Sequence, residues 1–161
     1  MRICVNKKIP LKMTNLPSLV EFINNDKDKL LKLVIDELLE MDYLPDSSNA
    51  TFKQIASEFI RFRHTSTLDA VDFDFYCSKN PFFGKNVISH AVNSTINYNT
   101  RFHSCGSYEL EDWIANFFHE CTHLTDEKSM YSFSHENQKD YGAAPFVIGA
   151  MAKELYLKNY R

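Results

Sequence analysis

The pentapeptide His119-Glu-Cys-Thr-His123 constrains the fold of this chain more than any other segment, because its residues work together only on a helix. Residues four apart on a helix project from the same face, one turn apart, so both imidazoles can reach a single metal ion. Glu120 lies about 100° further around the helix, from where its carboxylate can reach a water molecule on that metal. The segment is therefore predicted to be a helix that carries two zinc ligands and a general base.

The residues on both sides of the pentapeptide support a helix there. Large apolar side chains recur at helical spacing and give it a buried face: Trp113, Ile114, Phe117, Phe118 and Cys121. Ser107 can cap this helix, and the acidic residues of the following turn match the charge that a helix amino terminus favours. A last helix is predicted over residues 144–159, with Pro145 in its first turn.

The N-terminal part of the chain is typical of helices that pack into a core. Residues 18–44 open with Ser18 three residues before Glu21, which is a capping pattern, and continue with aliphatic side chains at helical spacing. A weak spot at residues 24–28 can divide this stretch into two helices. Residues 51–64 repeat the capping pattern and carry a second apolar stripe, so another helix is predicted there.

The middle of the chain has the composition of strands. Residues 70–77 alternate apolar and acidic side chains, which is typical of a half-buried strand. Residues 87–102 are rich in β-branched and aromatic side chains and predict one or two more. The predicted order along the chain is helices, then a small mixed or antiparallel sheet, then two helices. This order predicts an α+β fold. With 161 residues and no linker or repeat, we expect a single domain over residues 1–161.

Composition argues against several classes of partner and site. A net charge of −3 gives no basic surface for a phosphate backbone, so nucleic acid is not an expected partner. No apolar run is long enough for a membrane span, and Lys7 and Lys8 interrupt the place where a signal peptide is apolar. Either a cytoplasmic chain or export that reads no such peptide is expected. The four cysteines are widely spaced and are expected to be free, mostly buried thiols: Cys4, Cys77, Cys105 and Cys121.

A catalytic zinc needs a third protein ligand beside His119 and His123. His135 follows His123 by twelve residues, in a polar segment suited to a loop that returns to the metal, and histidine is the most common metal ligand. Asp126 is too close to His123 for the helix to end and the chain to return. The alternatives are acidic residues further along the chain: Glu136, Asp140 and Glu154. We therefore predict His119, His123 and His135 as the zinc ligands.

The pentapeptide resembles the hallmark of the zincin superfamily of metallopeptidases, and the match covers roughly residues 113–155. A distal histidine is similar to the metzincin arrangement, although that pattern puts its third histidine at position 129, which is Ser here. The resemblance implies a zincin-like domain in which Glu120 activates a zinc-bound water to hydrolyse peptide bonds of a protein or peptide substrate. It also implies that residues 94–102 form an edge strand that lines the cleft and pairs with extended substrate.

The same chemistry requires a donor that stabilises the oxyanion of the tetrahedral intermediate. Tyr141 and His103 are the candidates, and Tyr141 is preferred. Glu120 is expected to take a proton from water and later deliver it to the leaving amine. The expected function is that of a zinc-dependent metalloendopeptidase, with a toxin or effector protease of narrow specificity as one form of it.

Two other functions fit the same residues. One is a catalytically inactive zincin-fold binding protein in which zinc only holds the helices together. The other is a hydrolase that cleaves amide bonds of the cell wall. The presence of Glu120 favours catalysis over the first of these, since a structural zinc has no need of a general base.

Overall fold

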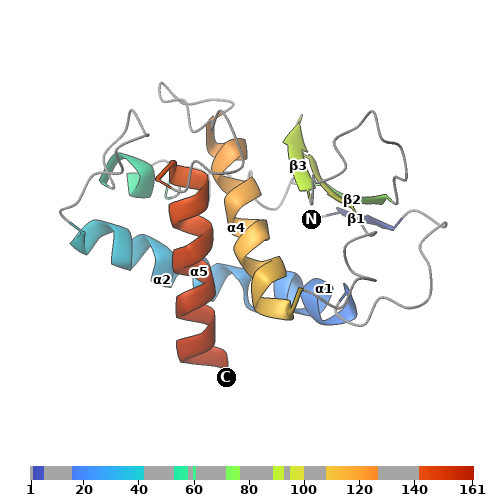
Figure 1. The fold of residues 1–161 in the computed structure, drawn as a ribbon, viewed down its shortest axis with the longest axis horizontal. Coiled ribbons are helices and arrows are strands. Elements are labelled where there is room, and N and C mark those ends of the chain that lie inside the picture. The colour runs from blue at the N-terminus through green and yellow to red at the C-terminus, as the bar shows by residue number, and fades with distance from the viewer. Residues whose placement is uncertain are drawn as a thin grey trace.

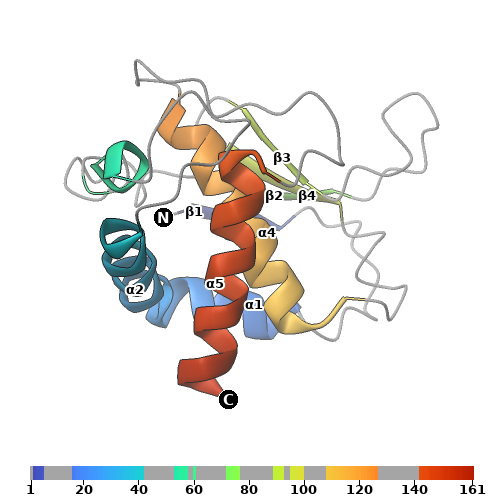
Figure 2. The same cartoon turned by 60° about the vertical axis from the view of Figure 1, so that its left-hand side comes forward.

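Helices dominate the structure, a computed structural model that describes residues 2–5, 16–41, 53–57, 60, 72–76, 89–92, 95–99, 108–126 and 142–161. The long helices are α1 (Leu16–Asn25), α2 (Lys27–Glu40), α4 (Leu110–Asp126) and α5 (Ala144–Tyr160), and residues 53–57 are also helical. Helix α1 packs against α4, and α2 packs against α5. Figures 1 and 2 show α4 beside α5, with a small sheet next to α4.

Helices α1 and α2 form one amphipathic stretch that breaks at Asp26, within the weak spot predicted at residues 24–28. The Asp26 N–H donates to the Phe22 carbonyl at 2.8 Å, and the Leu30 N–H donates to the Asp26 carbonyl at 3.1 Å. Hydrogen bonds therefore continue across the break. The buried stripe of α2 includes Leu30, Leu31, Val34, Ile35 and Leu38. Because α1 begins at Leu16, the predicted cap at Ser18 is wrong.

Helices α4 and α5 pack antiparallel at the centre of the core. Asp112 in the first turn of α4 lies beside Lys153, whereas His119 lies beside Phe146 in the first turn of α5. Helix α4 buries Trp113, Ile114, Phe117, Phe118, Cys121 and Leu124, and α5 buries Ala144, Ile148, Met151 and Ala152. The predicted helix around the pentapeptide and the predicted last helix are both confirmed.

The described strands form one sheet beside α4, in the spatial order β1 (Arg2–Val5), β2 (Asp72–Tyr76), β4 (Thr95–Asn99) and β3 (Ser89–Val92). Strands β1, β2 and β4 are parallel, and β3 pairs antiparallel with β4. Strand β4 is thus bonded on both sides, whereas β3 forms the edge next to α4. The implied role of residues 94–102 as an edge strand is therefore wrong, because β4 has no free edge for a substrate.

The predicted α+β, zincin-like fold class is wrong. Of the residues whose side-chain environment the structure defines, 86% lie in helices, and helical side chains form nearly all of the hydrophobic core. Among the strand side chains that the structure describes, Ile96 of β4 belongs to this core and Ala91 of β3 packs against it. A core of this kind points to a helical fold, with the small sheet as a peripheral addition. Alternating apolar patterns indicate strands, but the fold class depends on which elements bury the apolar side chains.

Gly149 permits the close approach of α5 to α4 beside the candidate metal ligands. A methyl group at this position would lie 2.8 Å from the backbone carbonyl oxygen of Ala115 and 3.4 Å from His119 Cβ. A contact of 2.8 Å with a backbone atom forces the helices apart, since that atom cannot move without the helix. The helix crossing next to His119 therefore depends on a residue without a side chain.

We expect Gly149→Ala to destabilise the chain by about 1–3 kcal/mol, because the shift of α5 outweighs the gain of about 1 kcal/mol that alanine brings to a helix interior. Urea unfolding of the two proteins measures the difference in the free energy of unfolding. Ala150→Gly, at the exposed neighbouring position, is the control that reports helix propensity alone. If the Gly149→Ala chain is at least as stable as the wild type, the close approach of α5 to α4 at Gly149 is contradicted.

Candidate functional site

His119 and His123 present their Nε2 atoms to one another on one face of α4. These atoms lie 3.3 Å apart, and the ring planes meet at 73°. Two imidazoles on one tetrahedral zinc, each bound at about 2.0–2.1 Å, have their nitrogen atoms about 3.3–3.4 Å apart. Without metal, the same distance suits a hydrogen bond in which one neutral ring donates to the other. The pair thus has the spacing of two ligands that share a zinc ion.

Glu120 turns its carboxyl group toward strand β3, where it is almost completely buried. The Ser89 hydroxyl oxygen lies 2.5 Å from Glu120 Oε1, and the backbone N–H of Ala91 also donates to the carboxyl group. Burial raises the pKa of Glu120 to about 7, and the two hydrogen bonds lower it in part. A carboxyl group that titrates near neutral pH is suited to exchange protons as a general base.

A groove of about 830 Å³ runs along α5 and reaches His119. Helices α2, α4 and α5 supply mostly apolar walls, among them Met41, Ala115, Phe146, Val147, Met151 and Leu155. The Phe146 ring stands edge-on to the His119 ring, with 4.7 Å between the ring centroids. The groove therefore places a largely apolar space next to one of the candidate metal ligands.

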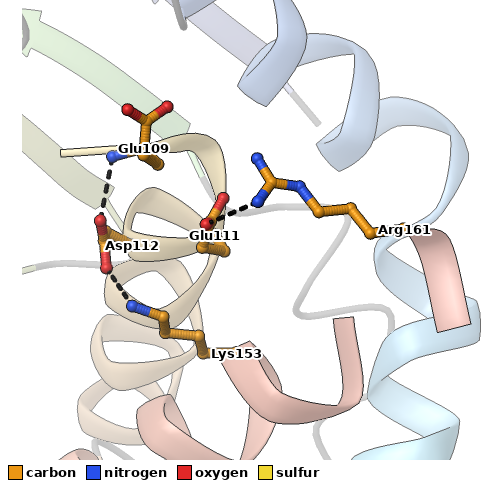
Figure 3. A network of polar contacts seen from close by, with 5 residues as sticks. All are labelled: Glu109, Glu111, Asp112, Lys153 and Arg161. Carbon is orange, nitrogen blue, oxygen red and sulfur yellow. Dashed lines mark hydrogen bonds and ion pairs between the residues drawn. The ribbon is translucent and has the colours of Figure 1, made fainter. Parts of the chain in front are cut away.

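Ion pairs join the start of α4 to α5 and to Arg161, which follows α5 (Figure 3). The Lys153 ammonium group donates to Asp112 Oδ1 at 2.5 Å, and the Arg161 guanidinium donates to Glu111 Oε1 at 3.1 Å. Pairs that are partly exposed contribute little to stability, typically below about 1 kcal/mol. They therefore add to the packing between the two helices but do not by themselves set the position of the histidine pair.

The same turn shows how α4 begins. The Glu109 carbonyl accepts hydrogen bonds from the N–H groups of Asp112 and Trp113, at 3.1 and 3.3 Å. In return, the Asp112 carboxylate accepts from the Glu109 N–H at 2.9 Å. This reciprocal arrangement makes Glu109 the residue before the first turn of α4, whereas Ser107, the predicted cap, lies outside the described residues. The predicted acidic first turn is present, with Glu111 and Asp112.

Several predicted site residues lie outside the described residues: His103, His135, Glu136, Asp140 and Tyr141. Their roles as zinc ligands or oxyanion donors therefore stay predictions. Asp126 is the last residue of α4, and its side chain is not described. Of the predicted site, the structure places His119, Glu120 and His123 together on one helix.

Glu154 is described, and the structure does not bring it to the histidine pair. Its side chain is exposed on α5, and no group of three metal-binding side chains forms among the described residues. Phe146 and Gly149 of α5 lie next to His119, and the side chain of Phe146 offers no ligand atom. The described residues therefore give no support to Glu154 as an alternative third ligand, and the other candidates lie outside them.

Two polar residues that the sequence analysis did not identify contact the site. Ser89 bonds to Glu120, and its hydroxyl oxygen also lies 2.6 Å from Asn116 Oδ1. Asn116 precedes Glu120 by one helical turn, so helical spacing is a signal that points to it. Ser89 precedes Glu120 by 31 residues. It has no local signal, because only the placement of β3 beside α4 brings it to the carboxyl group.

Two expectations from composition apply to the described residues. Cys121 is a buried free thiol, as expected, whereas the side chains of Cys4, Cys77 and Cys105 are not described. Burial raises the pKa of the Cys121 thiol well above its usual value, which disfavours the reactive thiolate. Within the described helices, none is long and apolar enough to cross a membrane.

The arrangement on α4 can hold a metal ion through two imidazoles and can exchange a proton through Glu120. Both capacities follow from distances and burial within this chain alone. No protein-family model, curated protein or solved structure matches the chain.

Proposed function

We propose that this chain is a zinc-dependent metallopeptidase, with His119 and His123 as zinc ligands and Glu120 as general base. One observation carries the proposal: two Nε2 atoms lie 3.3 Å apart on a helix that also holds a buried carboxyl group with a pKa of about 7. The donor set fits zinc, which binds imidazole nitrogen in tetrahedral geometry. Ligands that are already held on one rigid helix also lose little freedom when the metal binds.

His135 is the proposed third ligand, with Glu136 and Asp140 as alternatives. All three belong to residues 127–143, the connection from the end of α4 to the start of α5. This connection begins within one turn of His123 and ends near Phe146, which contacts His119. Its length allows each of the three residues to reach the histidine pair. Three protein ligands leave one coordination position for water or substrate, as catalysis requires.

The chemistry divides between the metal and Glu120. When bound, zinc supplies Lewis acidity that polarises the peptide carbonyl and makes water more acidic. Glu120 accepts a proton from the attacking water and delivers it to the nitrogen of the leaving amine. The burial of Glu120 supports this role, because it moves the pKa of the carboxyl group toward neutral pH. Tyr141 and His103 remain the proposed donors to the oxyanion.

The proposed substrate is a protein or peptide in an extended conformation. The described sheet ends at β3, which lies beside α4. A substrate segment that adds to this edge would lie directly against the general base, because the Ala91 N–H already bonds to Glu120. The groove beside His119 would then receive an apolar side chain of the same substrate.

A binding protein with a structural zinc is the second candidate, and the environment of Glu120 is compatible with it as well. The carboxyl group ties β3 to α4 through Ser89 and Ala91, so it has a structural use without catalysis. The expectation that only a catalytic site would retain Glu120 therefore does not separate the two functions. Hydrolysis of a substrate separates them, whereas metal content does not.

We expect the purified chain to hold about one zinc ion and to cleave peptides only when the zinc is present. Elemental analysis gives the zinc content per chain, and a quenched-fluorescent peptide library reports cleavage. Peptidoglycan fragments in a parallel assay test the cell-wall alternative. Phenanthroline is expected to abolish the activity because it removes the metal, and zinc in slight excess is expected to restore it.

The zinc content per chain, measured for variants in which one histidine is replaced, identifies the ligands. His135→Ala is expected to lose most of its zinc, whereas His64→Ala, which lacks ligand spacing, is expected to keep it. If His135→Ala retains zinc, Glu136→Gln and Asp140→Asn test the alternatives. A wild-type chain without zinc contradicts the metal site, and a chain that holds zinc but cleaves neither substrate supports the structural candidate.

A further inference from the structure

Ser89 joins strand β3 to two residues of α4 through a single hydroxyl group. Its Oγ lies 2.5 Å from Glu120 Oε1 and 2.6 Å from Asn116 Oδ1. Asn116 and Glu120 are one helical turn apart, so they hold the hydroxyl group between them on one face of α4. Ser89 is 8% exposed and Glu120 is 3% exposed, so bulk water has little access to these bonds. Two buried side chains, Ser89 and Glu120, and the half-buried Asn116 therefore form a polar cluster at the contact between sheet and helix.

The hydroxyl group has one proton, and two hydrogen-bonding patterns satisfy all three side chains. When Glu120 is protonated, it donates to Ser89, and Ser89 donates to the Asn116 amide oxygen. When Glu120 is ionised, a reversed Asn116 amide donates through its nitrogen to Ser89, and Ser89 donates to the carboxylate. Ser89 contacts Glu120 Oε1 in both patterns, so the contact does not depend on which side chain donates.

We propose that Ser89 is a positioning residue for the general base Glu120, and that Asn116 in turn positions the Ser89 hydroxyl group. The proposal rests on the proposed function, because it assigns Ser89 a role through the base. A glutamate side chain has several rotatable bonds, and catalysis requires its oxygen to stay within about 0.5 Å of the productive position. Strand β3 supplies that restraint twice, through the Ser89 hydroxyl and through the Ala91 N–H.

Ser89→Ala in the zinc-loaded full chain tests this role. The substrate is the peptide that the wild type cleaves fastest from the quenched-fluorescent library. We expect kcat to fall by about 10- to 100-fold, the range found for residues that orient a catalytic group, while KM and zinc content stay unchanged. Ser89→Thr keeps the hydroxyl group and is expected to keep kcat near the wild-type value.

Two further variants separate positioning from a general loss of structure. Ser57→Ala removes an exposed hydroxyl group that bonds to the Lys53 carbonyl at 2.8 Å, and it is expected to leave kcat unchanged. In the background of Glu120→Gln, Ser89→Ala is expected to leave the residual rate unchanged, because Ser89 acts through the base. If Ser89→Ala does not fold, Asn116→Ala is tested in its place. The positioning role then predicts a fall in kcat at constant KM for this variant.

A folded Ser89→Ala chain with wild-type kcat would overturn the inference and leave the proposed function intact. Equal loss of kcat in Ser89→Ala and Ser89→Thr would also overturn it, since the hydroxyl group is then not the cause. A wild-type chain that holds zinc and cleaves no peptide rejects the proposed function itself, and the positioning role with it. The wild-type assay thus distinguishes the two failures before any variant is made.

Discussion

Glu120→Gln is expected to lower the rate of peptide hydrolysis by about 100- to 10,000-fold, while the zinc content stays at the wild-type level. Glutamine has the shape of glutamate but cannot accept the proton of the attacking water. The fold is expected to survive, because glutamine reproduces the hydrogen bonds of the protonated carboxyl group. Its nitrogen can donate to Ser89, and its oxygen can accept from the Ala91 N–H.

The measurement is kcat and zinc content in the same preparation of each protein. Glu40→Gln, which changes an exposed carboxyl group at the end of α2, is the matched control and is expected to keep the wild-type rate. Loss of zinc together with activity would point to a disturbed metal site rather than to a missing base. Hydrolysis by Glu120→Gln near the wild-type rate would contradict the proposed mechanism.

The metal-free chain is expected to lose about 3 kcal/mol of stability between about pH 4.5 and pH 7 because of Glu120. Burial raises the pKa of this carboxyl group from 4.5 to about 7 in the folded chain. Between these values the folded chain holds a proton that the unfolded chain has lost, so the free energy of unfolding falls as the pH rises. The stabilising contribution is complete below the unfolded pKa and is gone above the folded one.

Urea unfolding of the chelated wild type and of Glu120→Gln, over a series of pH values, measures this contribution. Other titrating groups occur in both proteins, so the difference between the two curves isolates Glu120. The wild-type curve is expected to fall relative to that of the variant as the pH rises toward 7. Parallel curves would mean that the carboxyl group is not buried against β3 in solution.

The helices could be predicted because each has a local signal. The break at Asp26 follows from a polar run between two apolar stripes, and α5 carries Pro145 in its first turn, where the fixed backbone torsion of proline is suited to a helix. The fold class could not be predicted in this way. Apolar alternation indicates strands, but it does not say whether strands or helices bury the core. Strand β1 was missed because Arg2 pairs with Asp72, a relation between distant parts of the chain.

The candidate site also has residues that the sequence predicts and residues that it does not. His119 and His123 could be identified from the sequence because a spacing of four on a helix is a local relation. The raised pKa of Glu120 could not be predicted, since it depends on burial against a strand that comes earlier in the chain. Ser89 is joined to the site only through the tertiary placement of β3. Spacing alone also left the proposed third ligand open among His135, Glu136, Asp140 and Glu154.

If Glu120 has the proposed catalytic role beside its structural one, this double use of its carboxyl group constrains how such a chain can evolve. A lineage that no longer needs hydrolysis cannot replace Glu120 freely, because a smaller side chain leaves a buried hole and removes a partner of Ser89. Buried polar groups without partners are costly, so glutamate or glutamine is favoured at this position even after activity is lost. In descendants of this chain, Glu120 of the pentapeptide would therefore persist because it joins β3 to α4. The presence of the pentapeptide alone would then not identify an active enzyme.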